Sequence, residues 1–204
     1  MRWITREEAE GLIAAAKTLS QKKSSYLSDI IIVALHTGMR RGEMLGLEWS
    51  RVDFHAGLIH LEASHTKTAT RRSVPINATA REALLSRARY RSTHCPDARH
   101  VFCGQDCTPI VDPKEGFSSA CRKAGIENFR FHDLRHTCAA WLVSAGVPIY
   151  DVRDVLGHST VSMTERYAHL APERARSAVA VLDVGHDSVT PVFQAHSKGA
   201  KLTA

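Results

Sequence analysis

The sequence predicts an α+β fold that is mainly helical and contains one small three-stranded antiparallel sheet. Most of the chain shows apolar residues at helical spacing between recognisable helix caps. One stretch near the N-terminal third shows short segments rich in β-forming residues, separated by glycine and polar turns. A length of 204 residues suits one large domain or two small ones.

Two helices are predicted in the first forty residues. Thr5 and Glu8 have the spacing of a capping box, which starts an amphipathic helix that runs to about Leu19. The segment Ile30–Leu35 is apolar on nearly all sides, so we expect a buried helix. Gly38 ends it, as glycine commonly does at the C-terminus of a helix.

A short helix over residues 39–47 precedes a change from helical to alternating spacing. The predicted antiparallel strands are residues 51–54, 57–62 and 72–76. The polar link between the second and third strands contains Lys67.

The rest of the chain is predicted to be mostly helical, with residues 100–103 as one further strand segment. Asn77 is a good helix cap, and Ser159 or Thr160 caps a helix that carries Tyr167. The other helices are predicted over residues 77–90, 112–124, 132–146, 148–157 and 172–182.

Net charge and hydropathy limit the classes of protein that this sequence can represent. Lys plus Arg total 27 against 21 Asp plus Glu, which gives a net charge of +6 and a pI near 9.2. This modest excess fits a polyanionic partner such as nucleic acid. The sequence shows no signal segment and no apolar run long enough to cross a bilayer, so we expect a cytoplasmic protein with no membrane contact.

Five cysteines form no compact framework, so reduced thiols are expected. Cys103 and Cys107, with Cys95, His94 and His100 nearby, could suggest a zinc site. Their spacing matches no common zinc finger, and we therefore expect no metal.

The chemistry is concentrated in residues 131–170. His132 and Arg135 are three positions apart at the start of a helix, so they lie on one face. His158 and Tyr167 follow at the ends of later elements. Each residue alone has an ordinary explanation as a cap, a solvated face or a packing residue. The combination of imidazoles, guanidinium and phenol suits phosphate chemistry without a metal.

These residues and motifs upstream resemble the catalytic domain of the tyrosine recombinases, the phage integrase family. The motifs fall in the family's order and at its approximate spacings, and the likeness covers about residues 2–182. They are Thr37-Gly-Met-Arg40-Arg-Gly-Glu43, Lys67 in a Thr-Lys-Thr turn before Arg72-Ser-Val-Pro75, His132-Asp-Leu-Arg135-His-Thr137, Leu156-Gly-His158-Ser159 and Tyr167.

The resemblance implies six catalytic residues, with Glu43 steadying the site from behind. Arginine forks would stabilise charge that builds on the phosphate, and the phenol would attack it. His132 would be the base, Lys67 the general acid and His158 a hydrogen-bond donor to a phosphate oxygen. The six residues are Arg40, Lys67, His132, Arg135, His158 and Tyr167.

Several neighbours are expected outside the catalytic set. His136 should face another way on the helix, and Arg41 should contact phosphate or solvent. Arg71 and Arg72 are expected at the DNA backbone, with a solvated face as the equal alternative. Tyr150 is the rival nucleophile only if the family likeness is wrong.

The sequence therefore predicts a site-specific DNA recombinase that works through a 3′-phosphotyrosyl intermediate, without a metal or other cofactor. A type IB-like topoisomerase and a catalytically idle DNA-binding remnant are the alternatives. The expected partner is double-stranded DNA in the nucleoid, bound by a homotetramer that is monomeric when free. We expect a catalytic domain over residues 1–183, a polar tail over 184–204 and no N-terminal core-binding domain.

Overall fold

The fold belongs to the first of two units into which the chain divides, Met1–Pro172 and Glu173–Ala204. The residues that the computed structural model describes are 2–20, 26–62, 71–171 and 179. The predicted helix over 172–182 (apart from residue 179), the predicted tail over 184–204 and Lys67 lie outside the described residues.

Eight α-helices occur among the described residues, in the predicted order. Their bounds are α1 (Arg6–Ser20), α2 (Leu27–Thr37), α3 (Arg41–Leu45), α4 (Ala78–His94), α5 (Lys114–Lys123), α6 (Asp133–Ser144), α7 (Ile149–Leu156) and α8 (Ser162–Glu165). Two short 3-10 helices are η1 (Trp49–Arg51) and η3 (Ala168–Leu170).

Local signals place several of the helix ends. The backbone N–H of Glu8 donates to Thr5 Oγ1 at 3.1 Å, and the N–H of Thr5 donates to Glu8 Oε2 at 2.8 Å, which completes the predicted capping box. Gly38 ends α2 in the left-handed conformation, with φ 61°. Asn77 accepts from the N–H of Ala80 at 2.9 Å and starts α4, which ends at His94, four residues beyond the predicted end.

The sheet is antiparallel with strand order β1-β2-β3, as predicted, although β1 is only two residues long. Val52 pairs with Ile59, and Ile59 pairs in turn with Val74. The strands are β1 (Val52–Asp53), β2 (Leu58–Leu61) and β3 (Arg72–Pro75). The further strand predicted at 100–103 is wrong, because that segment makes only isolated bridges.

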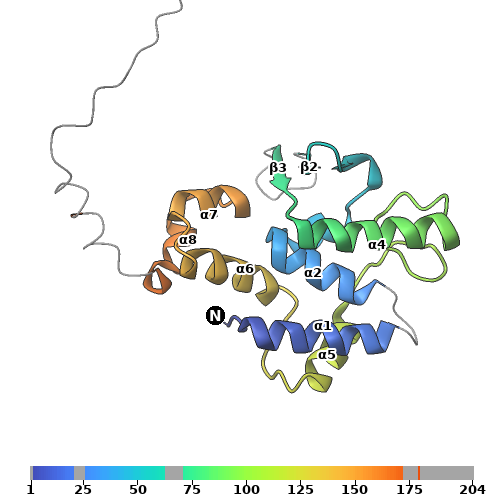
Figure 1. The fold of residues 1–204 in the computed structure, drawn as a ribbon, viewed down its shortest axis with the longest axis horizontal. Coiled ribbons are helices and arrows are strands. Elements are labelled where there is room, and N and C mark those ends of the chain that lie inside the picture. The colour runs from blue at the N-terminus through green and yellow to red at the C-terminus, as the bar shows by residue number, and fades with distance from the viewer. Residues whose placement is uncertain (1, 21–25, 63–70, 172–178, 180–204) are drawn as a thin grey trace, which may run out of the picture. The chain divides into compact units, whose positions relative to one another are not determined.

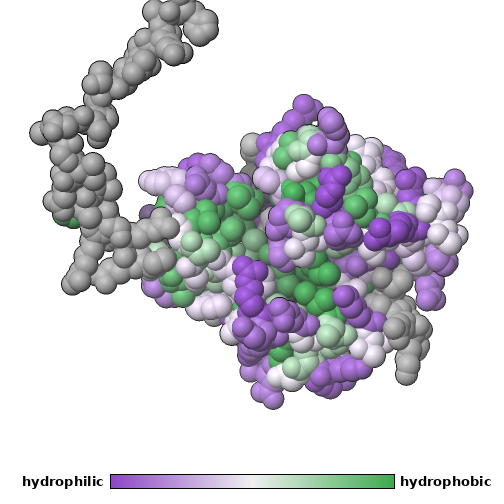
Figure 2. All heavy atoms as spheres, viewed as in Figure 1, coloured by the Kyte–Doolittle hydropathy of each residue, from purple (hydrophilic) through white to green (hydrophobic). Residues whose placement is uncertain are grey.

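The buried helix α2 lies at the centre of the unit. It contacts α1, α4 and α6, and Figure 1 shows α4 on one side of it and α6, α7 and α8 on the other. Its Ile30 and Ile31 are both fully buried, as expected of a helix that is apolar nearly all round. On the face drawn in Figure 2, hydrophobic residues form several separate patches among hydrophilic ones.

The segment before Tyr167 differs from the prediction. Helix α8 contains only four residues and starts after Val161, with no side-chain cap from Ser159 or Thr160. Tyr167 lies beyond the end of α8 and immediately before η3. The shorter helix places the tyrosine in a turn between two short elements.

The expectation of reduced cysteines is wrong for one pair. Cys95 and Cys107 form a disulfide with a Cα–Cα distance of 5.4 Å. The chain reverses its direction around Cys107, because Cys103 before it and Pro109 after it form an isolated antiparallel bridge. Cys103, Cys121 and Cys138 are free and buried. Sequence spacing did not reveal the pair because the reversal of the loop brings the two residues together.

Within the part of the chain that the structure describes, every helix is too short or too polar to span a lipid bilayer.

Candidate active site

A pocket of about 660 Å³ lies between the start of α3, the start of α6 and the segment from Gly157 to Tyr167. It brings together five of the six residues predicted to be catalytic. They are Arg40, His132, Arg135, His158 and Tyr167. The sixth, Lys67, lies outside the described residues.

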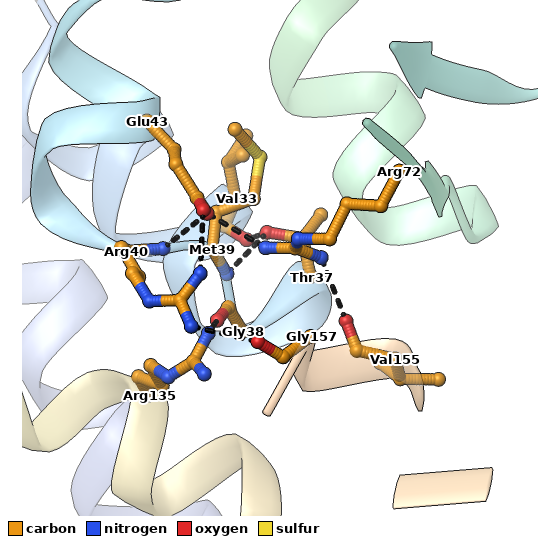
Figure 3. Close-up of polar contacts among 10 residues, drawn as sticks. All are labelled: Val33, Thr37, Gly38, Met39, Arg40, Glu43, Arg72, Arg135, Val155 and Gly157. Atoms are coloured by element: carbon orange, nitrogen blue, oxygen red, sulfur yellow. Dashed lines mark hydrogen bonds and ion pairs between the residues drawn. The ribbon is translucent and has the colours of Figure 1, made fainter. Parts of the chain in front are cut away.

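Arg40 is held at the pocket by Glu43, as Figure 3 shows. The guanidinium Nη1 donates to Glu43 Oε1 at 2.9 Å, and the backbone N–H of Arg40 donates to Oε2 at 2.8 Å. The Nη2 atom donates to the carbonyl of Gly157 at 2.7 Å. Glu43 is only 2% exposed, so it reaches Arg40 from behind the pocket. The family resemblance implied a supporting role for Glu43, and in the structure its carboxylate accepts from Arg40.

Arg72 does not lie at the surface, where a DNA-backbone contact was expected. Its Nη2 donates to Glu43 Oε2 at 2.7 Å, and its Nη1 donates to the carbonyl of Val155 at 3.0 Å (Figure 3). Its side chain is 13% exposed. Burial lowers the pKa of Arg72, and the ion pair with Glu43 opposes that shift. Arg72 therefore ties β3 to α3 and to the end of α7.

Arg135 is the most deeply buried arginine of the pocket, at 5% exposed. Its Nη1 donates to the carbonyl of Gly38, the residue that ends α2 (Figure 3). Burial, together with repulsion from the positive charges of Arg40 and Arg72, lowers the pKa of Arg135 to about 10. The guanidinium remains charged at neutral pH, and an anion entering the pocket would offset this crowding of positive charge.

His158 is held by a residue that the sequence did not single out. Its Nδ1 lies 2.8 Å from the hydroxyl of Thr164, which is fully buried. When Thr164 donates in this bond, the ring hydrogen lies on Nε2. Burial lowers the pKa of His158 to about 4, with added repulsion from Arg135 and Arg40. A neutral ring in this arrangement can still donate one hydrogen bond from Nε2.

Tyr167 is 1% exposed and packs with Ala139, Val143, Val152 and Leu156 of its own chain. Burial raises the pKa of its phenol, which keeps the hydroxyl protonated. Its exposed neighbour Arg166 also lines the pocket and lowers the pKa of the phenol in opposition to burial. Nothing in the sequence pattern distinguished Arg166 from other surface arginines.

The expectation that His136 faces away from the site is wrong. His136 lines the pocket, and its Nδ1 shares a hydrogen bond with the hydroxyl of Tyr167. The ring of His132 packs edge-on against that of His136, with centroids 4.9 Å apart. A sequence signal existed, because residues four apart share a helix face and His136 follows His132 by four.

The remaining predicted residues lie at the edge of the pocket or outside it. Arg41 lines the pocket and pairs with Asp112 at 3.2 Å, with about half of each side chain exposed. Arg71 is 81% exposed at the edge of the sheet and approaches Glu62 at 3.8 Å. Tyr150, the rival nucleophile, is 59% exposed on α7 and does not line the pocket.

The arrangement suits an anionic substrate with tetrahedral oxygens. The arginines present charged donors, His158 presents a neutral ring, and a phenol lies at the wall. Guanidinium forks match the spacing of phosphate oxygens. Among the described residues, no group of three or more histidine, cysteine, aspartate or glutamate side chains is placed to share a metal ion.

Known proteins resemble this chain in both sequence and fold. The integrase of Salmonella phage P22 is 31% identical over 210 residues, which cover 100% of this chain and 52% of that protein. The shufflon-specific DNA recombinase of Escherichia coli is 32% identical over 166 residues, 80% of this chain and 39% of that protein. The catalytic domain of bacteriophage HP1 integrase superposes with a TM-score of 0.69 at 28% identity, covering 90% of this chain and 96% of that domain.

The chain spans about half the length of the curated relatives that it matches. The description "Phage integrase family" belongs to a sequence model that matches residues 2–174, which is most of the chain. The chain therefore belongs to the phage integrase family and has the fold of a tyrosine recombinase catalytic domain.

Proposed function

We propose that this chain cuts and rejoins DNA as the catalytic domain of a site-specific recombinase, with Tyr167 as nucleophile. The observation that carries the proposal is the pocket in which the phenol of Tyr167 meets Arg40, Arg135 and His158. Relatives named as integrases and recombinases favour strand exchange over a topoisomerase-like activity or an idle remnant.

Arg40 and Arg135 supply the electrostatic part of the reaction. A phosphodiester resists attack because its negative charge repels nucleophiles, and that charge grows in the transition state. Arg40 and Arg135 hold their guanidiniums in place through Gly157 and Gly38 before substrate arrives. Preorganised donors of this kind stabilise the transition state more than the ground state.

The proposed bond changes are those that the family resemblance implies, with Tyr167 as the attacking group. The oxygen of Tyr167 attacks phosphorus, the bond from phosphorus to the 5′-oxygen breaks, and a 3′-phosphotyrosyl link forms. Lys67 gives a proton to the departing 5′-oxygen, and His158 donates a hydrogen bond to a phosphate oxygen. Because a phosphodiester is retained in the adduct, attack by another 5′-hydroxyl reverses the step without ATP, a metal or another cofactor.

The proposed substrate is double-stranded DNA, bound by a homotetramer of the whole protein at the nucleoid. Arg41 and Arg166 are exposed cations that line the pocket, and Arg71 is exposed beside β3; all three are available for the phosphate backbone. Titrating salt against DNA affinity for each Ala variant tests these contacts, since a lost phosphate contact lowers the salt dependence.

A covalent trapping experiment tests the function. Supercoiled plasmid is incubated with the protein in EDTA, quenched in SDS and examined for protein joined to DNA, with Tyr167→Phe alongside. We expect an adduct in the wild type and none in the variant. An adduct that survives in Tyr167→Phe would transfer the role to another nucleophile such as Tyr150. Loss of the wild-type adduct in EDTA alone, or no adduct on DNA that the protein binds, would overturn the proposal.

A further inference from the structure

The hydroxyl of Tyr167 forms a hydrogen bond with an imidazole of the same chain. Nδ1 of His136 and the phenolic oxygen share a hydrogen bond, although the two residues are 31 positions apart. The ring centroids lie 6.1 Å apart and the planes are tilted by 43°. The half-buried His136 extends from α6, and the turn after α8 brings the tyrosine to it. Helix α6 and the turn after α8 therefore supply the two groups that share the phenolic proton.

The phenol carries its proton and the imidazole is neutral at the start, which are the states that a base-assisted attack needs. Burial raises the pKa of Tyr167, so the free hydroxyl keeps its proton and needs a base. Burial lowers the pKa of His136, and the neighbouring charges of His132, Arg166 and Arg135 act in the same direction, against Asp133. A neutral imidazole has one nitrogen lone pair available, and here that nitrogen can be Nδ1.

We propose that His136 is a catalytic residue that accepts the proton of Tyr167 as its oxygen attacks the phosphate. The inference rests on the function proposed above and assigns the base within it. The role belongs to His136, which contacts the hydroxyl, in place of His132, which the sequence likeness suggested. The edge-on packing of His132 against His136 makes His132 a positioning neighbour of the base.

The proton balance is complete within the chain and its substrate. As the oxygen–phosphorus bond forms, the phenolic proton moves to Nδ1 of His136, while Lys67 protonates the departing 5′-oxygen. In the rejoining step, the 5′-hydroxyl gives its proton back to Lys67, and His136 returns its proton to the departing phenolate. One imidazole therefore acts as base in cleavage and as acid in rejoining, as microscopic reversibility requires.

Single-turnover adduct formation with His136→Asn and His136→Gln tests the assignment. Asparagine can place an amide near Nδ1 and preserve a hydrogen bond, but it accepts no proton. We expect both variants to slow adduct formation by about 10² to 10⁴, the usual contribution of a general base. The defect should shrink as pH rises toward the pKa of the phenol. Adduct formation within about threefold of wild type at pH 7 would overturn the proposal.

Replacing Tyr167 by 3-fluorotyrosine distinguishes the loss of a general base from the loss of an arginine that stabilises charge on the phosphate. Fluorine lowers the pKa of the phenol, so a variant that lacks the base should recover rate. We expect marked recovery in His136→Asn and little in Arg40→Ala, whose defect is electrostatic, or in His132→Asn. Recovery confined to His132→Asn would overturn the proposal and return the base to His132.

A measurement without DNA keeps the assignment testable if the variants fold poorly. In otherwise unchanged protein, the ¹⁹F resonance of 3-fluorotyrosine at position 167 should shift with a pH midpoint equal to that of the His136 ring. His132, His158, Asp133, Arg135 and Arg166 also face this pair, so the His136 ring is followed directly by ¹⁵N-labelled histidine. A ¹⁹F midpoint that differs from the midpoint of the His136 ring would contradict the hydrogen bond between His136 and Tyr167. If the contact holds but the wild type forms no adduct in the trapping experiment, the proposed function fails separately.

Discussion

Arg72 and Glu43 form a largely buried ion pair across 2.7 Å, and the same carboxylate also binds Arg40. One acidic side chain that is 2% exposed thus positions two guanidiniums, one at the pocket and one on β3. Arg72 also donates to the carbonyl of Val155 near the end of α7. The sheet, the short helix α3 and the segment that carries His158 are therefore joined through a single carboxylate.

Glu43→Ala should destabilise the domain by about 3 to 5 kcal/mol, because it leaves the largely buried guanidiniums of Arg40 and Arg72 without a negative partner. Urea unfolding measures the change. The double variant Glu43→Ala with Arg72→Met should recover part of the loss, since it removes one uncompensated charge. Additive effects of the two substitutions would show that Arg72 and Glu43 do not interact.

Arg40→Ala and Arg135→Ala should each reduce adduct formation by about 10³ or more, as removal of an arginine does in comparable phosphoryl transfers. Binding to DNA, measured by gel shift at low salt, should remain detectable in both, because other cations remain. Arg71→Ala is the matched control for the loss of an exposed cation that is proposed to contact the DNA backbone, because Arg71 precedes β3 and lies outside the pocket; it should weaken binding without abolishing adduct formation. Cleavage near the wild-type rate in Arg40→Ala would contradict its proposed role in stabilising the charge on the phosphate.

Gly157→Ala should be more damaging than the same substitution at Gly125. Both glycines have left-handed φ, +64° and +70°, so alanine is strained at both by about 1 to 2 kcal/mol. At Gly157 a Cβ would also lie 2.5 Å from Nε of Arg72, whereas nothing lies within 4 Å at Gly125. Urea unfolding and adduct formation should both show the difference. Equal losses of stability would mean that Arg72 moves aside freely.

Acidification should weaken the fold through His158. Its pKa falls from an ordinary 6.5 to about 4, so the unfolded chain binds a proton between these values that the folded chain does not. The free energy of unfolding should therefore decrease as pH falls from about 6.5 to about 4, and this contribution is absent above that window. His136 and His36 have lowered pKa values and act in the same direction.

His158→Asn isolates that contribution. Asparagine has no titrating ring, so urea unfolding at pH 7 and pH 5 should show a smaller pH effect in the variant than in the wild type. The same pH response in both proteins would mean that His158 keeps an ordinary pKa.

Reduction of the disulfide between Cys95 and Cys107 should lower stability by about 3 kcal/mol, the value for a closed loop of this size. Thermal unfolding with and without dithiothreitol measures the effect. Cys107→Ser should be equally destabilised and should not respond to dithiothreitol. Cys103→Ser, which keeps the disulfide, should retain the full response. A wild-type protein that is indifferent to dithiothreitol would contradict the pairing.

The parts of the fold that could be predicted are encoded within a few residues of one another. Thr5 and Glu8 cap α1, Gly38 ends α2 and Asn77 starts α4, each through contacts no more than four positions apart. The order of the helices and the presence of the sheet were predicted from such signals and from the spacing of apolar residues along the chain. The short α8 escaped prediction because Ser159 and Thr160 make no cap there.

The sequence by itself determined the chemical groups of this protein: two arginines, a lysine, two histidines and a tyrosine in motifs that resemble one family. Only the tertiary structure decided how they pair. His136 turns to Tyr167 from 31 positions away, and Arg72 turns inward to Glu43 from 29 positions away. These pairings depend on how α6, α8 and β3 pack, and packing over such separations is set by the whole core, which no local pattern records.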